Sequence, residues 1–321
     1  MYKFGAIQSP ADHRDFLYRA IFAAEALPSK WSRRTEMSPV RNQGAFGTCV
    51  GFAASGVKDN HERREFGGNI QTSPLFVYKK CKEMDGIPNQ EGTYPRVAMK
   101  ALTDFGVCLE SFFPYSQMKW PTMPAIPADA ERLAANYKIG AYASIGTVDE
   151  VRQAIVKSGP VLGAILVCEN FVSVGSNGII NLPAGKSLGG HAICVVGYDD
   201  DMKANGHTGY FEVRNSWGDT WGEGGYCWIP YDFFNQRLDT GMPCWFESWS
   251  SVDIILPPKA CKEGYLWIGK NYALVDGVEV PLDVPPEIKG DRTLVPLRFM
   301  AERMGYAVEW DQVKQQIRFY K

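Results

Sequence analysis

The chain has 321 residues, of which 45% are hydrophobic and 22% charged, which is the composition of an ordinary soluble globular protein of two or three domains. A formal net charge of −2 gives no basic surface for a nucleic acid, and no apolar run is long enough to span a bilayer. The stretch FLYRAIFAAEAL at 16–27 is interrupted by Arg19 and Glu25, so it is a poor secretory signal. These features predict a cytoplasmic protein, or one whose export signal has been removed.

The first part of the chain predicts helices. Thr48 is a good N-cap for a helix that has Cys49 in its first turn and stops at a pair of glycines. Two further helices are expected over 71–84 and 93–106, each after a turn-rich entry. We therefore expect a helical lobe over about 30–130.

The pattern becomes β-rich after about residue 131. A predicted helix at 148–159 is followed by β-branched and aromatic runs bounded by Gly, Pro and Asn, which predict strands at 160–168, 191–199, 209–217 and 226–230. A helical lobe followed by a β-rich lobe, to about residue 256, is an α+β arrangement. The functional site is expected in the cleft between the lobes.

A second boundary is predicted by the prolines in LPPKACK. Residues 1–256 are expected to form the first domain, 257–262 a stiff linker and 263–321 a small α+β domain. In that domain we expect strands with a turn at Asp276-Gly277, a helix at 294–305 and a closing hairpin at 307–320.

The eight cysteines do not form a metal-binding pattern, because none belongs to a C-x-x-C pair. Three of them lie in apolar or aromatic runs and are expected to be reduced core residues: Cys168, Cys194 and Cys227. Cys81 and Cys108 are the first pair to test for a disulfide.

Cys49 stands where the glycine-rich loop RNQGAFGT meets a helix. A helix N-terminus stabilises a thiolate, so this cysteine is either an activated nucleophile or a buried structural residue. His191 is the best candidate base, because two glycines precede it and a strand follows it. The other three histidines are expected at the surface: His13, His61 and His207.

The stretch NSWGDTWGEGGY supplies partners for His191. Asn215 can accept a hydrogen bond from the imidazole and hold its orientation, and Trp217 can shield that bond from water. The alternative interpretation is a glycine-rich turn with core tryptophans.

Three blocks in this order, QGAFGTC, GGHAICVVGYD and NSWGDTWGEGGY, resemble the signature blocks of the papain-like cysteine peptidases. The resemblance covers roughly residues 10–250 and implies a fold with a helical lobe, a β-barrel-like lobe and a cleft between them. It implies peptide-bond hydrolysis through a thioester and assigns roles to the catalytic residues: nucleophile Cys49, base His191, orienting Asn215 and oxyanion donor Gln43, with the backbone N–H of Cys49.

The resemblance also implies substrate-binding positions. Trp217 would shield the catalytic pair, and the Gly190 carbonyl would accept a hydrogen bond from a peptide substrate. By looser analogy, Glu91 and Gly92 would offer backbone to an extended peptide. The roughly forty residues before the Gln43 loop are shorter than the inhibitory propeptide of many family members, so either no inhibitor exists or the cleft is blocked by other means.

Residues 263–321 resemble the copper amine oxidase N-terminal-like domain through VDGVEVPL, DRTLVPLRFMAERMG and VEWDQVKQQIRFY. This stretch has no histidine or cysteine, which copper sites ordinarily need, so a binding or spacer module for a cell-surface or protein ligand is expected. The pairing of the two domains indicates a bacterial protein and leaves export to the cell surface open. No cofactor or metal is predicted.

The sequence leaves three functions open. The first is a peptidase acting on peptides or proteins. The second is a transpeptidase or ligase, in which an amine instead of water resolves the thioester. The third is a peptide-binding or adhesion module without turnover, which does not need the four residues Cys49, His191, Asn215 and Gln43 to be intact.

Overall fold

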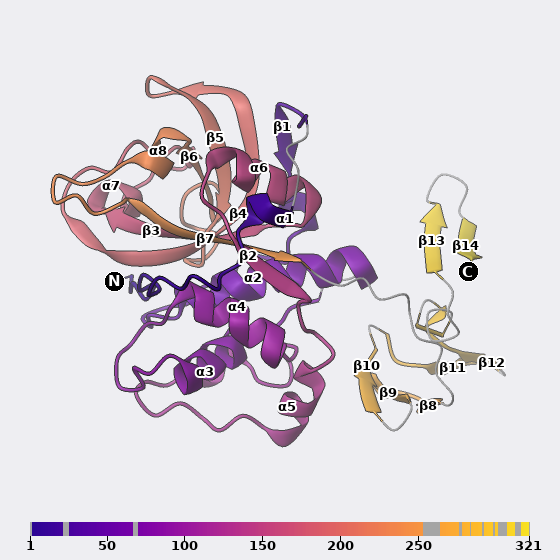
Figure 1. The fold of residues 1–321 in the computed structure, drawn as a ribbon. Coiled ribbons are helices and arrows are strands. Elements are labelled where there is room, and N and C mark those ends of the chain that lie inside the picture. Colours follow the sequence, from indigo (N-terminus) through magenta and orange to yellow (C-terminus); the bar gives the residue numbers. More distant parts are fainter. Residues whose placement is uncertain are drawn as a thin grey trace. The chain divides into compact units, whose positions relative to one another are not determined.

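The computed structural model describes residues 2–21, 26–66 and 70–252, together with parts of the C-terminal region: 264–275, 278–282, 284–290, 292–297, 299–300, 307–311 and 316–320. The chain forms two compact units, Met1–Ile254 and Ile255–Lys321. Figure 1 shows the helices and strands of both units. No helix in the described ranges has the length and apolar character needed to cross a membrane.

The helical half of the first unit contains α2 (Cys49–Phe66), α3 (Pro74–Met84), α4 (Pro95–Asp104) and α5 (Ala128–Ala134). Both α3 and α4 begin with a proline, which is favourable at the first helical position because its missing N–H would have no partner there. The three predicted helices are confirmed, each within three residues of its expected bounds. The glycine pair after α2 lies outside the described residues.

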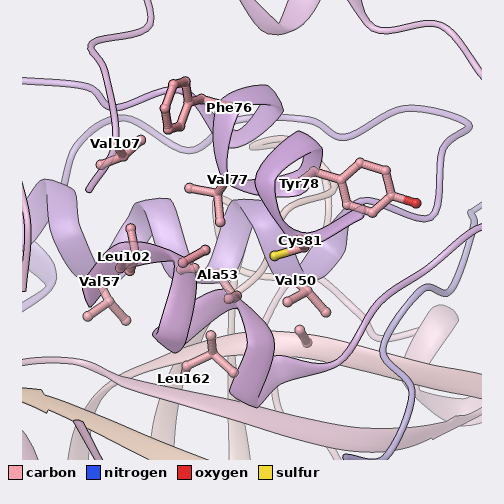
Figure 2. Packing of buried hydrophobic residues seen from close by; sticks show 14 of the residues in the cluster. Val50, Ala53, Val57, Phe76, Val77, Tyr78, Cys81, Leu102, Val107 and Leu162 are labelled. Carbon is pink, nitrogen blue, oxygen red and sulfur yellow. The ribbon is translucent and has the colours of Figure 1, made fainter. Parts of the chain in front are cut away.

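Helix α2 is the centre of the helical half. Its side chains Val50, Ala53 and Val57 are almost completely buried and belong to one apolar cluster with Phe76 of α3 and Leu162 of the sheet. Figure 2 shows these residues between the neighbouring helices and the strands. This packing fixes the direction of α2 and therefore the position of its first residue, Cys49.

The other half is a mainly antiparallel seven-stranded sheet with the order β2-β7-β3-β4-β5-β6, in which β1 also pairs with β4. The strands are β1 (Lys30–Ser32), β2 (Ala141–Ser144), β3 (Val161–Cys168), β4 (Ser187–Ala204), β5 (His207–Arg214), β6 (Tyr226–Pro230) and β7 (Trp245–Val252). Over the described residues this path is open, so the expected barrel-like lobe is corrected to an open sheet. The α+β class is confirmed.

Short helices and a second apolar cluster cover the remaining face of the sheet. Thr147 caps α6 (Val148–Lys157) by accepting a hydrogen bond from the N–H of Glu150. The smaller helices are α1 (Tyr18–Ile21), η1 (Arg34–Glu36), η2 (Tyr115–Gln117), α7 (Glu169–Val172) and α8 (Asp232–Asn235).

The second unit contains three small antiparallel groups of strands in its described parts. They are β8 (Gly264–Leu266) with β9 (Tyr272–Val275) and β10 (Val278–Pro281), β11 (Glu287–Lys289) with β12 (Arg292–Leu294), and β13 (Ala307–Asp311) with β14 (Gln316–Tyr320). The last pair is the predicted closing hairpin. The predicted linker at 257–262, the turn at 276–277 and most of the helix at 294–305 lie outside the described residues.

Two expectations are wrong. Cys81 and Cys108 are both free and buried, so they form no disulfide. His61 is only 4% exposed, because the polar face of α2 packs inside the first unit. His207 is the first residue of β5 and is only partly buried, which does not contradict its expected place at the surface, and its Nδ1 is 2.6 Å from the carboxylate of Asp232. The expectation for Cys168, Cys194 and Cys227 as reduced core residues is confirmed.

Candidate active site

Cys49 is the first residue of α2 and is completely buried. Its sulfur accepts hydrogen bonds from the backbone N–H groups of Ala192 and Gly5, and the first turn of α2 also stabilises the anion. Ala192 directly follows His191 on β4. The end of the helix and the strand that carries the predicted base therefore meet at the Cys49 sulfur.

His191 and Asn215 are joined by a hydrogen bond of 2.8 Å between Nε2 and Oδ1. The same Oδ1 accepts a hydrogen bond from the N–H of Ser216 at 2.7 Å, so it is an acceptor and Nε2 carries the proton. His191 Nδ1 is then unprotonated in the neutral ring. It is buried and has no hydrogen-bond partner among the residues that the structure describes, which leaves it available to take a proton.

Trp217 covers this histidine. Its ring lies 4.6 Å from the imidazole, centroid to centroid, and is only 1% exposed. Phe171 of α7 contacts both rings from the side. The apolar surroundings exclude water from the hydrogen bond between His191 and Asn215.

Burial determines the protonation of the pair. Desolvation raises the pKa of the Cys49 thiol, against the stabilising backbone N–H groups. Desolvation also lowers the pKa of His191 to about 4, against the hydrogen bond to Asn215. Both shifts favour the neutral forms, so a thiolate–imidazolium pair is not the stable state of this closed arrangement.

Gln43 is fully buried beside the pair. Its side-chain oxygen accepts a hydrogen bond of 2.6 Å from the Ser216 hydroxyl, which orients the amide nitrogen the other way. That nitrogen donates to the Phe46 carbonyl at 2.7 Å and to the Lys3 carbonyl at 3.1 Å. The predicted oxyanion donor is thus already bonded to a carbonyl from the start of the chain.

Residues 2–9, here called the N-terminal segment, pass between the helical half and the sheet over Cys49. The N–H of Ala6 donates to the Gly190 carbonyl at 3.0 Å. On the other side, the N–H of Thr93 donates to the Gly5 carbonyl at 2.8 Å and the N–H of Ile7 donates to the Thr93 carbonyl at 3.0 Å. Ala6 and Thr93 form a parallel bridge.

The segment approaches the protein backbone too closely for any side chain at position 5. A Cβ atom on Gly5 would lie 1.9 Å from the carbonyl oxygen of Gly47. A Cβ on Gly190 would likewise lie 2.1 Å from the carbonyl oxygen of Ala6. The two glycines make this close contact sterically permissible.

The first residues of the segment lie against the aromatic cover of the site. The Tyr2 ring stacks on Trp217 with centroids 4.1 Å apart, and the Phe4 ring meets His191 edge-on at 6.2 Å. The Lys3 ammonium pairs with Glu91 at 3.0 Å. The Glu91 carboxylate also accepts the N–H of Gly47 at 2.7 Å, just before Cys49.

The sequence-predicted residues are therefore found as follows. Cys49, His191, Asn215, Gln43, Trp217 and Gly190 are brought together, and all six contact the N-terminal segment or one another. Glu91 contributes its side chain, and the Gly92 N–H bonds to the Tyr78 hydroxyl.

The backbone that pairs with the segment belongs to Thr93, one residue beyond the predicted pair. Neither Thr93 nor the segment itself is predicted from the sequence. The composition of residues 2–9 carries no distinct signal for this contact.

Two family models match the chain. Residues 27–238 match the papain family cysteine protease model, and residues 245–319 match the copper amine oxidase N-terminal domain model. Copper sites ordinarily need histidine or cysteine ligands. The second match contains no histidine or cysteine after residue 261, so these residues do not fit a copper site.

Similar proteins are found among curated sequences. An uncharacterised peptidase C1-like protein of Acanthamoeba polyphaga mimivirus is 31% identical over 207 residues, which is 60% of this chain and 64% of that protein. Cathepsin B-like cysteine proteinase 4 of Caenorhabditis elegans is 29% identical over 231 residues, 62% of this chain and 67% of that protein. The chain thus spans about two thirds or less of the length of these relatives.

Solved structures give the same result. Xylellain, a cysteine protease from Xylella fastidiosa, is 27% identical with a TM-score of 0.65 over 78% of this chain and 96% of that one. ProCathepsin B S9 from Trypanosoma congolense is 18% identical with a TM-score of 0.63 over 79% of this chain and 87% of that one, which shows a shared fold.

Proposed function

The chain belongs to the papain family of cysteine proteases, and from that premise we propose that it is a cysteine peptidase whose own N-terminal segment holds it inactive. The nucleophile would be Cys49, the base His191 and the orienting residue Asn215. The observation that carries this proposal is the His191 ring, which bonds Asn215 through Nε2 and keeps Nδ1 unpaired.

The proposed reaction begins once the segment has left. The Cys49 thiol gives its proton to His191 Nδ1, and the thiolate attacks the carbonyl carbon of a peptide bond. The negative oxygen accepts hydrogen bonds from the Gln43 amide and the Cys49 N–H, and each such donor lowers the barrier by about 3–4 kcal/mol. The Cys49 N–H is suited to this because the first N–H groups of a helix have no intrahelical acceptor.

The imidazolium then protonates the leaving amine as the C–N bond breaks, which gives a thioester on Cys49 and neutral His191. A water molecule that gives a proton to His191 attacks the thioester. Its collapse releases a carboxylic acid and returns the proton to the sulfur. Asn215 keeps the same nitrogen of His191 directed at these atoms throughout.

The orientation of the N-terminal segment supports an inhibitory role. The leaving amine must lie beside His191, so the carboxyl side of a substrate would lie where Tyr2 and Phe4 are found. The segment runs in the opposite sense, because its later residues, Ala6 to Ser9, lie on the far side of Cys49. A chain in this reversed direction does not present its carbonyl groups as a substrate does, so it would block the site without being cleaved.

The substrate class that follows is a peptide or an unfolded protein. For residues 263–321 we propose a binding or spacer role toward a protein or cell-surface ligand, on the basis of the family match alone. The similar proteins named above come from a virus, a nematode, a bacterium and a trypanosome, and the bacterial source of this chain stays a prediction.

The test uses the full chain and measures the cleavage of casein by mass spectrometry. Gly5→Val is designed to expel the N-terminal segment, because the added carbon atoms would meet the Gly47 carbonyl. We expect Gly5→Val to cleave casein, Gly5→Val with Cys49→Ala to be inactive, and the unaltered chain to be slow. Gly175→Ala is the matched control, since a Cβ there has only an ordinary contact with Asn177.

Two outcomes would contradict the proposal. One is cleavage that survives Cys49→Ala. The other is absence of cleavage in a Gly5→Val chain whose Cys49 is readily alkylated by iodoacetamide. Excess glycinamide in the reaction distinguishes hydrolysis from ligation, because a ligase would give products carrying the added amine.

A further inference from the structure

A small cavity lies beside Asn215, where α2 meets the sheet. Its volume is about 10 Å³, which is room for one particle of the size of a water molecule. Residues 52–53 of α2 line it on one side and residues 192–194 of β4 on the other, together with Arg41 and residues 214–216 at the end of β5. The cavity therefore adjoins the residue that orients the proposed base.

Arg214 brings a positive charge into this interior. It is the last residue of β5 and pairs with Cys194 of β4, so both side chains lie on the same face of the sheet. That face packs on α2, because a Cβ atom on Gly56 would lie 2.9 Å from Arg214 Nη1 and 3.6 Å from the Cys194 sulfur. The glycine leaves room for the guanidinium, and Arg214 is only 5% exposed.

The second arginine of the cavity, Arg41, has carboxylates beside it. Its Nη2 donates to Asp59 at 2.9 Å, and its Nη1 lies 3.9 Å from Glu110. Asp59 also accepts hydrogen bonds from the Ser38 hydroxyl and from the N–H and the hydroxyl of Thr72. These four hydrogen bonds use the acceptor sites of the Asp59 carboxylate, so it has none left for Arg214.

Arg214 has no carboxylate partner among the residues that the structure describes. Its Nη2 donates to the Pro39 carbonyl at 2.6 Å and to the Ser38 hydroxyl at 3.2 Å, and both acceptors are neutral. Burial raises the pKa of the neighbouring Cys194 thiol to about 12, so the thiol is neutral as well. A buried cation with only neutral partners is unfavourable, and an anion beside it would stabilise it.

Three N–H donors of the cavity residues lack acceptors. Arg41 Nε, Arg214 Nε and Asn215 Nδ2 are buried and have no hydrogen-bond partner in the described part of the chain. None of these atoms can itself accept a hydrogen bond. A water molecule has two lone pairs, so it would leave one donor unpaired, and its own protons would need acceptors. A monovalent anion can accept from all three donors and balance the charge of Arg214.

We propose that this cavity binds a small monovalent anion, chloride in particular, between the Nε groups of Arg41 and Arg214 and the Nδ2 of Asn215. The three donors gain an acceptor, and the buried charge of Arg214 gains a counter-charge. The binding of the ion is independent of the proposed function, whereas its effect on the reaction rests on that function.

The bound anion orients Asn215. The amide Oδ1 accepts the hydrogen bond from His191 Nε2, and the anion holds Nδ2 on the other side of the same amide. A flipped amide would turn its N–H groups toward the protonated Nε2 and its oxygen toward the anion, so the ion disfavours the flip. The ion also increases the negative charge on Oδ1, which stabilises His191 when it becomes an imidazolium.

The first test measures binding on the unaltered full chain. Crystals grown in sodium bromide should show an anomalous bromide peak within hydrogen-bond distance of the three nitrogens. An ordered water in that place, or no density there, overturns the inference.

The second test measures Tm in sodium chloride and in an equal concentration of sodium gluconate, whose anion is too large for the cavity. Chloride should raise Tm by about 2 °C or more. Arg214→Gln removes the charge and should abolish this difference. Arg237→Gln removes an equal charge in an exposed loop and should keep it. A difference that survives Arg214→Gln overturns the inference, and the bromide experiment decides if that variant does not fold.

The third test measures peptide cleavage by full chains that carry Gly5→Val. Replacing gluconate by chloride should raise kcat roughly fivefold, the contribution of one hydrogen bond, with KM unchanged because the ion acts on the base. An equal kcat in the two salts overturns the role given to the ion and leaves the peptidase intact. A chain that binds bromide and cleaves nothing contradicts the peptidase and leaves the anion site.

Discussion

The two ends of the N-terminal segment are held by different chemistry. Tyr2 and Phe4 are held by rings, through stacking on Trp217 and edge contact with His191. Ser9 is held by two hydrogen bonds to the carboxylate of Glu247. The aromatic end covers the group that would move protons, and the polar end covers a buried carboxylate.

This difference predicts different sensitivities. The stacking and edge contacts between rings depend little on charge. The His191 ring beneath them is kept neutral by burial, so this end is sensitive to protonation of that ring. The Ser9 contacts involve an anion, so a competing cation or a lost donor should loosen that end first. Opening of the segment can therefore start from either end. Three changes distinguish the two ends: acid, Phe4→Ala and Ser9→Ala.

Acid should give the largest effect, through the aromatic end. The pKa of His191 is lowered to about 4 under the segment and should return toward its usual 6.5 when water enters. Because the closed state disfavours the proton, its stability is full above pH 6.5 and is lost as the pH falls toward 4. Between pH 7.5 and 5 the open fraction should rise roughly 30-fold.

Hydrogen exchange of the Ala6 and Ile7 amides, corrected for the intrinsic effect of pH on exchange, measures this opening. The control is His191→Gln, which has no imidazole to protonate and should lose the acid response. An acid response of equal size in that variant would assign the opening to another group. The pKa of Glu247, raised by burial under the segment, acts in the opposite sense and makes the observed change smaller than this.

Phe4→Ala should give the next largest effect, also at the aromatic end. Loss of a half-buried ring and its edge contacts with His191 and Trp217 removes about 1.5 kcal/mol of the free energy that holds the segment closed. The open fraction should therefore rise slightly more than tenfold. The rate of Cys49 alkylation by iodoacetamide, followed by mass spectrometry, should rise by that factor. Phe4→Leu should change it less, and an equal rise in both variants would exclude a specific role for the ring.

The fold was predictable from the sequence where the pattern is local. The helices beginning at Pro74 and Pro95 have an N-terminal proline, the helix beginning at Cys49 follows a glycine-rich loop, and the strands around His191 are continuous apolar runs. The open edge of the sheet was not predictable, because β2 and β7 are ordered by pairing between residues about a hundred positions apart. The buried position of His61 was missed for a related reason: the charged face of α2 is covered by other elements.

The candidate site was predictable in the residues that we propose to be catalytic, and not in what covers them. Cys49, His191 and Asn215 stand in short blocks whose composition is specific. The segment at 2–9 has ordinary composition, and its role depends on backbone hydrogen bonds to Gly190 and Thr93 that any sequence can form. Glu247 was missed because its orientation depends on a bulge in β7, for which the sequence has no distinct signal.

Ser9→Ala should give the smallest of the three effects, at the polar end. It removes the hydrogen bond from the Ser9 hydroxyl to Glu247 and keeps the one from the backbone N–H. The lost bond contributes about 1 kcal/mol to the stability of the closed segment, so the rate of Cys49 alkylation should rise roughly fivefold. Gln8→Ala, at the exposed neighbouring position, should leave the alkylation rate unchanged. The rate constants of the two variants can be compared directly, because neither position touches Cys49.

A double-mutant cycle decides whether the effect of Ser9 acts through Glu247. If the hydroxyl stabilises the closed segment by bonding the carboxylate, Ser9→Ala should raise the alkylation rate less in a Glu247→Gln chain than in the unaltered one. Additive effects would mean that Ser9 is held by something else, and the polar end would then lose its distinct chemistry. Non-additive effects would instead show that the Glu247 carboxylate holds the polar end of the N-terminal segment closed.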